Sequence, residues 1–293
     1  MIHTIQNAFL TVTVSECGAE LQSIQDVNGV QYLWQGDPKY WGDRAPVLFP
    51  FIGRLTNNSY KCMGKVYPMS IHGFAAASRF TLAEKTQRSI VLQLKSTPQT
   101  YAQYPFEFSL WITYTLCENT LYISYRVENL NNKTMHFGIG GHPGFNVPLV
   151  DGESFEDYEL EFSMPCCPDR IGFSPAVYLN GCDKVYPLRD ERFIDLKHEL
   201  FDDDAIILKN MAREVTLRSK ISGNGIVVRY PNMPYLGIWH WPKTDAPYVC
   251  IEPWSSLPAR QDVVEELLCK SDLVQVQPYS VYRSEWSIAV LSR

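Results

Sequence analysis

The stretch FEFSLWITYTL, residues 106–116, alternates apolar side chains with mostly polar ones. Every second residue from Phe106 to Leu116 is apolar, and residues with a period of two lie on one face of a strand. A polar turn at Glu118-Asn119 follows, and a second alternating run, LYISYRV, occupies residues 121–127. The two runs predict an antiparallel hairpin with one face in the core and the other face polar or aromatic.

Shorter runs of the same kind extend this prediction along the chain. They lie at residues 9–14, 32–34, 90–94, 158–162, 215–217, 226–230 and 286–290. The best helical candidate is residues 262–269, where Val263, Val264, Leu267 and Leu268 recur at helical spacing. Many strands with almost no helix predict an all-β fold, a large β-sandwich or barrel. Because nothing resembles a linker, we expect residues 1–293 to form a single domain.

Composition narrows the class of protein. Of 293 residues, 45% are hydrophobic and 20% are charged, which is ordinary globular usage and excludes a disordered chain. The formal net charge is −6 and there is no basic tract, so we expect no nucleic-acid partner. No apolar run approaches the roughly 20 residues of a membrane span. The opening MIHTIQNAFL lacks the pattern of a secretory signal, so we expect a cytoplasmic protein without a membrane partner.

The eight cysteines do not have the spacing of a metal site. Cys166 and Cys167 are adjacent, and adjacent side chains of a strand point to opposite faces, which makes a shared tetrahedral metal awkward. No C-x-x-C or H-E-x-x-H pattern occurs. We therefore expect free, mostly buried thiols rather than a zinc site.

Four segments place a titratable or charged residue among apolar residues, glycines and prolines. Arg54 ends the apolar run 45–54, where its guanidinium must find an acceptor or reach solvent. The alternative for Arg54 is an ion pair at the end of a strand. His72 precedes Gly73, which permits close approach of the backbone to a ligand. The alternative for His72 is a loop residue or a hydrogen-bonded core imidazole.

The other two segments carry His142 and Glu252. Four glycines and a proline surround His142 in residues 138–146, which predicts a mobile or tightly turned loop. Glu252 follows Val-Cys-Ile, and a partly buried carboxylate has a raised pKa and is a better base. The alternatives are an incidental histidine in a turn and an edge-strand glutamate paired with an arginine. Together with aromatic residues such as Trp239 and Trp241, these groups suggest acid–base chemistry on a polar small molecule such as a sugar.

Five blocks of sequence carry a resemblance to a known family. They are APVLFPFIGR (45–54), IHGFA (71–75), GGHPGFN (140–146), FDDDAI (201–206) and IEPW (251–254). In these blocks and their order, the chain resembles the aldose 1-epimerase (galactose mutarotase-like) superfamily, most of all its LacX-type proteins. The resemblance implies a large twisted antiparallel β-sandwich with a shallow sugar cleft, and catalysis without a metal or other cofactor.

The resemblance also implies a role for each matching residue. Glu252 would be the general base and His142 the general acid, while Arg54 and His72 would form hydrogen bonds to sugar hydroxyls or to the ring oxygen. A base that takes the proton of the C1 hydroxyl and an acid that protonates the ring oxygen open the hemiacetal. After rotation about C1–C2 the reverse transfers close the other anomer. Each positioned acid or base typically contributes about 10²–10⁴-fold to the rate.

Asp204 is implied as a substrate-binding acid, with Asp202 and Asp203 as adjacent candidates. The chain departs from the best-known mutarotases at two glycines. Gly141 precedes His142 where those proteins have asparagine, and Gly53 precedes Arg54 where they have an Asn-Arg pair. A galactose specificity therefore does not carry over.

The expected function is interconversion of the α and β anomers of a free hexose, by a monomer or homodimer whose partner is the sugar alone. One alternative is a hexose-6-phosphate 1-epimerase, for which Arg44 lies near the position of a phosphate-binding arginine. The other alternative is a non-catalytic carbohydrate-binding or sensing module on the same fold.

Overall fold

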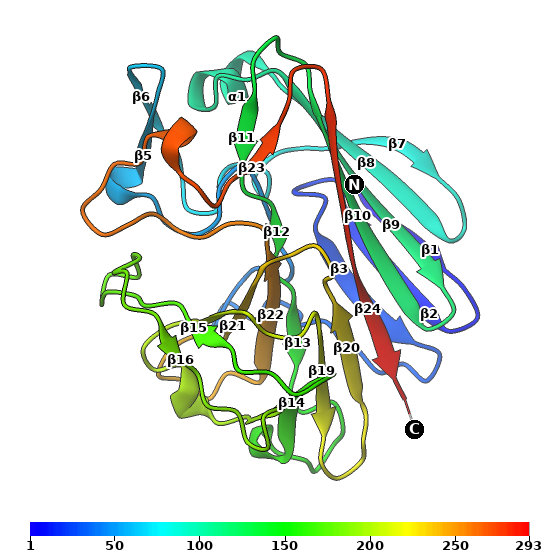
Figure 1. The fold of residues 1–293 in the computed structure, drawn as a ribbon. Helices are drawn as coiled ribbons and strands as arrows, with labels where there is room; N and C mark the ends of the chain where they lie inside the picture. The colour runs from blue at the N-terminus through cyan, green and yellow to red at the C-terminus, as the bar shows by residue number, and fades with distance from the viewer. Residues whose placement is uncertain (293) are drawn as a thin grey trace.

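The computed structural model describes residues 1–292, and two large antiparallel sheets dominate it (Figure 1). The nine-stranded sheet has the order β17 (Phe193–Asp195), β14 (Tyr158–Phe162), β19 (Glu214–Ser219), β20 (Gly225–Arg229), β24 (Val281–Leu291), β10 (Thr120–Asn129), β9 (Phe108–Cys117), β8 (Ser89–Lys95) and β7 (Thr81–Lys85). The eight-stranded sheet has the order β16 (Lys184–Val185), β15 (Asp169–Arg170), β18 (Ile206–Lys209), β21 (Tyr235–Trp239), β22 (Tyr248–Trp254), β12 (Gly140–Gly141) and β4 (Val47–Leu48), and β13 (Gly144–Asn146) also pairs with β22. The prediction of an all-β sandwich is confirmed.

Small sheets and short helices complete the described chain. The small sheets are β1 (Ile2–Gln6), β2 (Leu10–Ser15) and β3 (Leu21–Asp26); β5 (Ser59–Cys62) and β6 (Lys65–Pro68); and β11 (Met135–Phe137) and β23 (Val274–Val276). The helices are α1 (Pro98–Gln103) and the 3₁₀ turns η1 (Thr56–Asn58), η2 (Phe155–Asp157), η3 (His198–Phe201) and η4 (Leu267–Cys269). Within residues 1–292, no helix has the length and apolar character that crossing a membrane requires.

The predicted hairpin is formed by β9 and β10. Its register places Leu110 opposite Val127 and Tyr114 opposite Ile123, and all four side chains are buried. Most of the other alternating runs also lie in the nine-stranded sheet, where they form β8, β14, β19, β20 and β24. Half-buried strands show the period of two because only one face of each strand meets the core.

The run 32–34 forms a single β-bridge rather than a strand. The Tyr32 N–H donates to the carbonyl of Ile24, whereas the Trp34 N–H donates to the carbonyl of Gly144. Because neighbouring residues bond to different segments, no ladder forms.

The prediction of a helix over 262–269 is wrong except for the turn η4 at its end. Asp262 has a φ of 59°, outside the helical region. The carbonyl of Glu265 accepts a hydrogen bond from the N–H of Lys61 in β5, at 2.7 Å. Two nitrogens of the Arg260 guanidinium donate to the Glu265 carboxylate, each at 2.9 Å. These tertiary contacts hold the segment extended and outweigh its helical periodicity.

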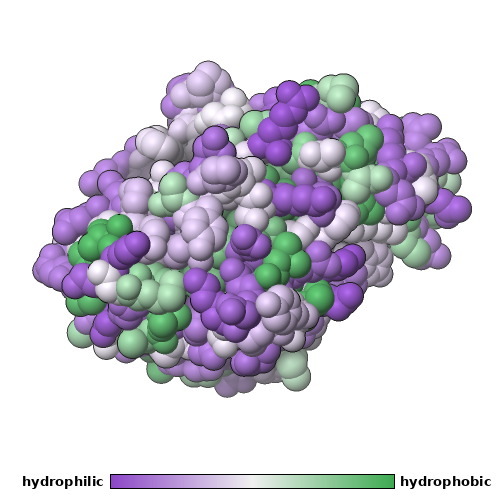
Figure 2. All heavy atoms as spheres, turned by 90° about the horizontal axis from the view of Figure 1, so that it is seen from above, coloured by the Kyte–Doolittle hydropathy of each residue, from purple (hydrophilic) through white to green (hydrophobic). Residues whose placement is uncertain are grey.

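The core lies between the two large sheets, and one connected cluster of buried side chains runs from Ile5 to Val290. In β22, Val249 and Ile251 belong to this cluster, so Cys250 and Glu252 point to the opposite face of the sheet. All seven residues of β22 are buried, and on this opposite face Cys250 belongs to a cluster that includes Trp34 and against which Trp41 packs. Hydrophilic and hydrophobic residues are interspersed over the surface seen from above (Figure 2).

Candidate active site

Strand β22 carries Glu252 to a cleft on the side of the sheet that faces away from the core. The Glu252 side chain is 1% exposed, and its Oε2 atom has no hydrogen-bond partner within residues 1–292. Gly237 of β21 lies opposite in the register. A Cβ atom at Gly237 would come within 3.1 Å of the Glu252 Cβ, so the space for this side chain depends on the glycine.

His142 lies between the short strands β12 and β13, and its N–H donates to the carbonyl of Pro46. Its Nε2 atom is 3.2 Å from Glu252 Oε2. The Nδ1 atom of His142 is buried and has no hydrogen-bond partner in the described chain. The expected mobile or tightly turned loop is thus two strand segments of the sheet. Its glycines permit close packing, since a Cβ atom at Gly141 would lie 2.5 Å from Cζ2 of Trp286. This contact explains why no asparagine precedes the histidine.

Burial sets the protonation of the pair. It raises the pKa of Glu252 well above its usual value, and the negative charge of Asp204 raises it further. Burial lowers the pKa of His142 well below its usual value, and the neighbouring His72 lowers it further. Both side chains therefore favour their neutral forms, with one proton on the carboxyl group. Such a pair is suited to exchanging a single proton.

His72 lines the same cleft and has a fixed tautomer. Its backbone has a φ of 61°, and its N–H donates to the carbonyl of Gly53 at 3.0 Å. The N–H of Gly53 in turn donates to Nδ1 of His72 at 3.1 Å. Burial and the charge of Arg54 lower the pKa of His72 to about 4, so the ring is neutral near pH 7. Because Nδ1 accepts, the proton of the neutral ring is on Nε2, and His72 offers a donor.

Arg54 and Asp204 supply the charges that complete the set of predicted residues. Arg54 is exposed in the cleft, and no carboxylate within residues 1–292 forms an ion pair with it, so the alternative of an ion pair at a strand end is not supported. Asp204 follows η3 with a φ of 77°, and its Oδ1 accepts the N–H of Ala205 at 2.7 Å. Asp202 and Asp203 are exposed and do not line the cleft, whereas Asp204 does.

The cleft has a volume of about 440 Å³, within the roughly 300–1,000 Å³ typical of small-molecule sites. It brings together all five residues predicted from the sequence. Its wall includes Trp41 and Trp239, whose ring centroids lie 4.9 Å and 5.6 Å from that of His142. The sequence predictions missed Trp41 and Asp43, which lie in a stretch without strand periodicity. The feature of the sequence that could have indicated this part of the site is the aromatic Trp41 next to Gly42.

Five of the eight cysteines are exposed, so the expectation of mostly buried thiols is wrong.

Among residues 1–292, one group of side chains has the spacing of a metal site. Ligand atoms of His142, Cys250 and Glu252 all lie within 4.8 Å of one another. Burial also raises the pKa of Cys250 well above its usual value, so a metal would have to displace protons from both the thiol and the Glu252 carboxyl. The chemistry of this donor set favours proton transfer over metal binding.

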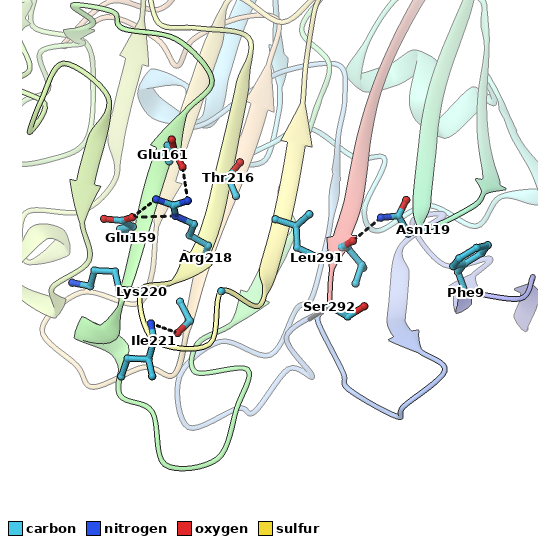
Figure 3. Close-up of a pocket in the computed structure, with 13 residues that line it drawn as sticks. Phe9, Asn119, Glu159, Glu161, Thr216, Arg218, Lys220, Ile221, Leu291 and Ser292 are labelled. Atoms are coloured by element: carbon cyan, nitrogen blue, oxygen red, sulfur yellow. Dashed lines mark hydrogen bonds and ion pairs between the residues drawn. The ribbon is translucent and has the colours of Figure 1, made fainter.

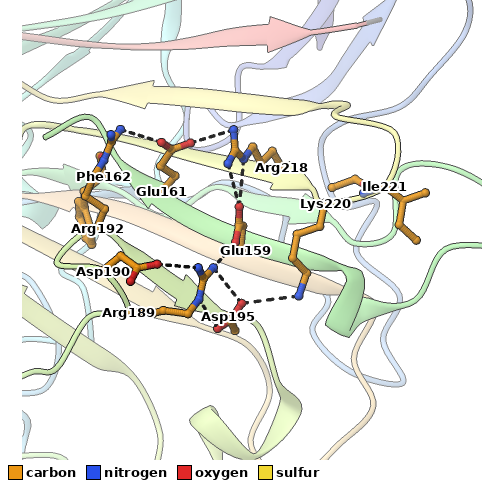
Figure 4. Close-up of polar contacts among 11 residues, drawn as sticks. Glu159, Glu161, Phe162, Arg189, Asp190, Arg192, Asp195, Arg218, Lys220 and Ile221 are labelled. Atoms are coloured by element: carbon orange, nitrogen blue, oxygen red, sulfur yellow. Dashed lines mark hydrogen bonds and ion pairs between the residues drawn. The ribbon is translucent and has the colours of Figure 1, made fainter. Parts of the chain in front are cut away.

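A larger hollow of about 790 Å³ lies on the nine-stranded sheet, on the face turned away from the core (Figure 3). Arg218 forms ion pairs there with Glu159 and Glu161, both at 3.0 Å. Arg189 joins Glu159 at 2.6 Å and Asp195 at 2.9 Å (Figure 4). These charges face opposite charges, and none of the predicted catalytic residues lies among them. The cleft of Glu252 and His142 is therefore the candidate active site.

Comparison with known proteins identifies the family of the chain. The sequence profile of the family described as aldose 1-epimerase matches residues 1–264. The chromosomal LacX protein of Lactococcus lactis is 35% identical, over 98% of this chain and 99% of its own length. A galactose mutarotase related enzyme from Lactobacillus acidophilus is 35% identical, with a TM-score of 0.94, over 100% of this chain and 98% of that one. A galactose mutarotase-like protein from Lactobacillus casei is 31% identical, with a TM-score of 0.93. The match covers 99% of this chain and 100% of that one. This chain belongs to the aldose 1-epimerase family.

Proposed function

We propose that the protein interconverts the α and β anomers of a free hexose by acid–base opening of the sugar ring. The observation that carries the proposal is the 3.2 Å contact between His142 Nε2 and Glu252 Oε2 in one cleft. Neither Oε2 of Glu252 nor Nδ1 of His142 has a hydrogen-bond partner within residues 1–292. Two buried proton carriers of this kind destabilise a fold unless a ligand uses them.

The reaction moves one proton through the pair in each direction. Glu252 as carboxylate takes the proton of the C1 hydroxyl, and His142 as imidazolium protonates the ring oxygen, so the C1–O5 bond breaks and the aldehyde forms. The single proton of the pair reaches His142 from Glu252 across their 3.2 Å contact. After rotation about C1–C2, His142 removes the proton from O5 and Glu252 returns its proton to O1. O5 then adds to the other face of the aldehyde.

His72 and Arg54 would stabilise charge during this transfer. Neutral His72 offers its Nε2–H as a donor, and the Arg54 guanidinium has no competing carboxylate partner within residues 1–292. Donors held in place before the reaction stabilise charge that develops on the sugar oxygens. The Asp204 carboxylate would accept hydrogen bonds from sugar hydroxyls and thereby orient the ring.

The charges of the cleft favour a neutral sugar over a phosphorylated one. The Arg44 guanidinium donates to the carbonyl of Gln22 at 2.7 Å, and Arg44 does not line the cleft. Arg54 supplies the single guanidinium of the lining, which also holds the carboxyl groups of Asp43, Asp204 and Glu252. A phosphate dianion there would meet more acidic than basic side chains. A non-catalytic binding module, the other alternative, gives no reason to bury an acid beside a base.

Mutarotation of freshly dissolved α-hexoses, followed by polarimetry, tests the proposal. Wild type should accelerate anomer exchange for at least one hexose of a panel, and Glu252→Gln should lower kcat by about 10²–10⁴-fold while remaining folded. Glu84→Gln, at an exposed position in β7, is the matched control and should keep full activity. Failure of the wild type to exceed the spontaneous rate on every hexose would refute the proposed function.

A further inference from the structure

A hairpin in the wall of the cleft holds a valine in a backbone conformation that valine rarely adopts. Val177 has a φ of 63° and lines the cleft together with Phe173 of the same hairpin. We propose that Val177 contacts the bound hexose and is a specificity-determining residue, which favours sugars that turn C–H groups rather than hydroxyls toward it. The inference rests on the proposed function and adds a binding residue to its cleft.

The turn of this hairpin is of a kind that usually contains glycine. The N–H of Ser174 donates to the carbonyl of Tyr178 at 2.9 Å, and the N–H of Val177 donates to the carbonyl of Ser174 at 2.9 Å. These bonds enclose a three-residue loop in which Val177 is the last residue. The last residue of such a loop is typically left-handed, and glycine is preferred there because it has no Cβ atom. Valine at this position therefore strains the backbone.

The strain coincides with the lining of the cleft. Within residues 1–292, Val177 is the only residue with a positive φ that is branched at Cβ, the type of side chain that tolerates this conformation least. Two other residues of the lining, His72 and Asp204, have φ values of 61° and 77°. Backbone strain of this kind is concentrated at sites that bind ligands. Because His72 and Asp204 are already proposed to bind the sugar, Val177 fits the same pattern.

Backbone hydrogen bonds join the hairpin to the segment that carries Arg54. The N–H of Leu179 donates to the carbonyl of Ala259 at 2.9 Å, and the N–H of Gln261 donates to the carbonyl of Leu179 at 2.9 Å. The N–H of Ala259 in turn donates to the carbonyl of Arg54 at 2.9 Å. The half-buried Val177 side chain is thus held in place before a substrate binds, and such preorganisation lowers the entropic cost of binding.

Apolar side chains accompany Val177 in this part of the lining. They are Phe173 of the same hairpin and Pro258, which precedes the Ala259 bonded to the hairpin. A wall of this kind offers no hydrogen-bond partner to a sugar hydroxyl, and a polar group that loses water without gaining a partner is disfavoured. Mannose, allose and galactose each differ from glucose in the side of the ring that carries one hydroxyl. A contact with one such position therefore discriminates between epimers.

Kinetics on these four hexoses test the inference. Wild type should prefer one of them. Val177→Gly should lower kcat/KM for the preferred hexose about fivefold, as expected when apolar carbons lose their contact with a ligand. It should change kcat/KM for the poorest measurable hexose less than twofold, so that the preference narrows. Val177→Ile keeps a branched apolar side chain and should retain the wild-type preference.

Urea denaturation separates this role from a structural one. Val177→Gly should raise the urea midpoint, because glycine adopts a positive φ without strain. Tyr279→Gly is the matched control, since Tyr279 has a φ of 56°, is 71% exposed and does not line the cleft. It should also raise the midpoint but leave the kinetics on every hexose unchanged. Loss of activity with a lowered midpoint in Val177→Gly would mean that Val177 only supports the fold.

Two kinetic results would also overturn the inference. One is a wild type that converts the four hexoses equally well, and the other is a Val177→Gly variant that keeps the wild-type preference. If the wild type accelerates anomer exchange of no hexose, the proposed function fails, and calorimetry on the same sugars still tests Val177. Val177→Gly should then weaken the binding of the tightest hexose about fivefold. Unchanged affinity, or a wild type that binds no hexose, would refute the role of Val177.

Discussion

Replacing Glu252 by glutamine removes a buried carboxyl group whose protonation differs between the folded and unfolded states. Burial raises the pKa of Glu252 well above its usual value, so the folded protein retains a proton that an unfolded glutamate releases near about pH 4.3. Because the folded state then binds one proton more than the unfolded state, wild-type stability decreases as pH rises. The slope reaches about 1.4 kcal/mol per pH unit while folded Glu252 stays protonated. Glutamine does not titrate in either the folded or the unfolded state. The free energy of unfolding of Glu252→Gln therefore does not decrease with rising pH for this reason.

Urea denaturation followed by tryptophan fluorescence, between about pH 5 and about pH 8, measures the difference. We expect Glu252→Gln to gain stability relative to wild type as pH rises, although it has lost mutarotase activity. Glu84→Gln, at an exposed position in β7, controls for loss of a surface charge and should show little pH-dependent gain. A stability difference that does not change with pH would mean that buried Glu252 is ionised, and the reasoning about its protonation would be refuted.

Three further predictions concern the pair and its surroundings. His142→Asn and Glu252→Gln should each lower kcat about 10²–10⁴-fold. The double variant should lose little more activity than either single variant, because the two groups share one proton. If the two losses multiply in a double-mutant cycle, this prediction is wrong. Because the pKa of His72 is about 4, kcat/KM should stay constant near neutrality and fall only as the imidazole ring protonates near pH 4. A fall in kcat/KM centred near pH 6.5 would contradict this prediction. Gly141→Asn should destabilise the fold by about 1–3 kcal/mol in urea, because its Cβ would lie 2.5 Å from Trp286; unchanged stability would disprove the packing argument.

The sequence predicted one sheet much better than the other, for a physical reason. The strands of the nine-stranded sheet face the core on one side, so their side chains alternate, as in the β9–β10 hairpin. Strand β22 of the second sheet is buried on both faces and shows no such alternation. In β22 the site was predicted from the type of residue, because Glu252 is a carboxylate in an otherwise apolar run. For residues 262–269 the helical pattern predicted a helix that does not form, because tertiary contacts hold the segment extended.

The individual residues of the cleft were easier to nominate than its shape. His72, His142 and Glu252 stood out because titratable groups are unusual in segments rich in apolar residues or glycine. Trp41 was missed, because an aromatic residue in a sequence does not indicate whether its ring packs in the core or lines a cavity. Whether a ring packs in the core or lines a cavity depends on contacts between segments that are far apart in the sequence. One such contact is the hydrogen bond from the N–H of His142 to the carbonyl of Pro46.

In the proposed mechanism, Glu252 and His142 act on O1 and O5, the two oxygens bonded to C1 of the sugar. A crystal structure of Glu252→Gln with a bound hexose tests it most directly, since this variant should bind the sugar without turning it over. We predict O1 of the sugar within hydrogen-bond distance of the side chain at position 252 and O5 within hydrogen-bond distance of His142 Nε2. A hexose bound in the cleft with C1 turned away from both side chains would contradict the account.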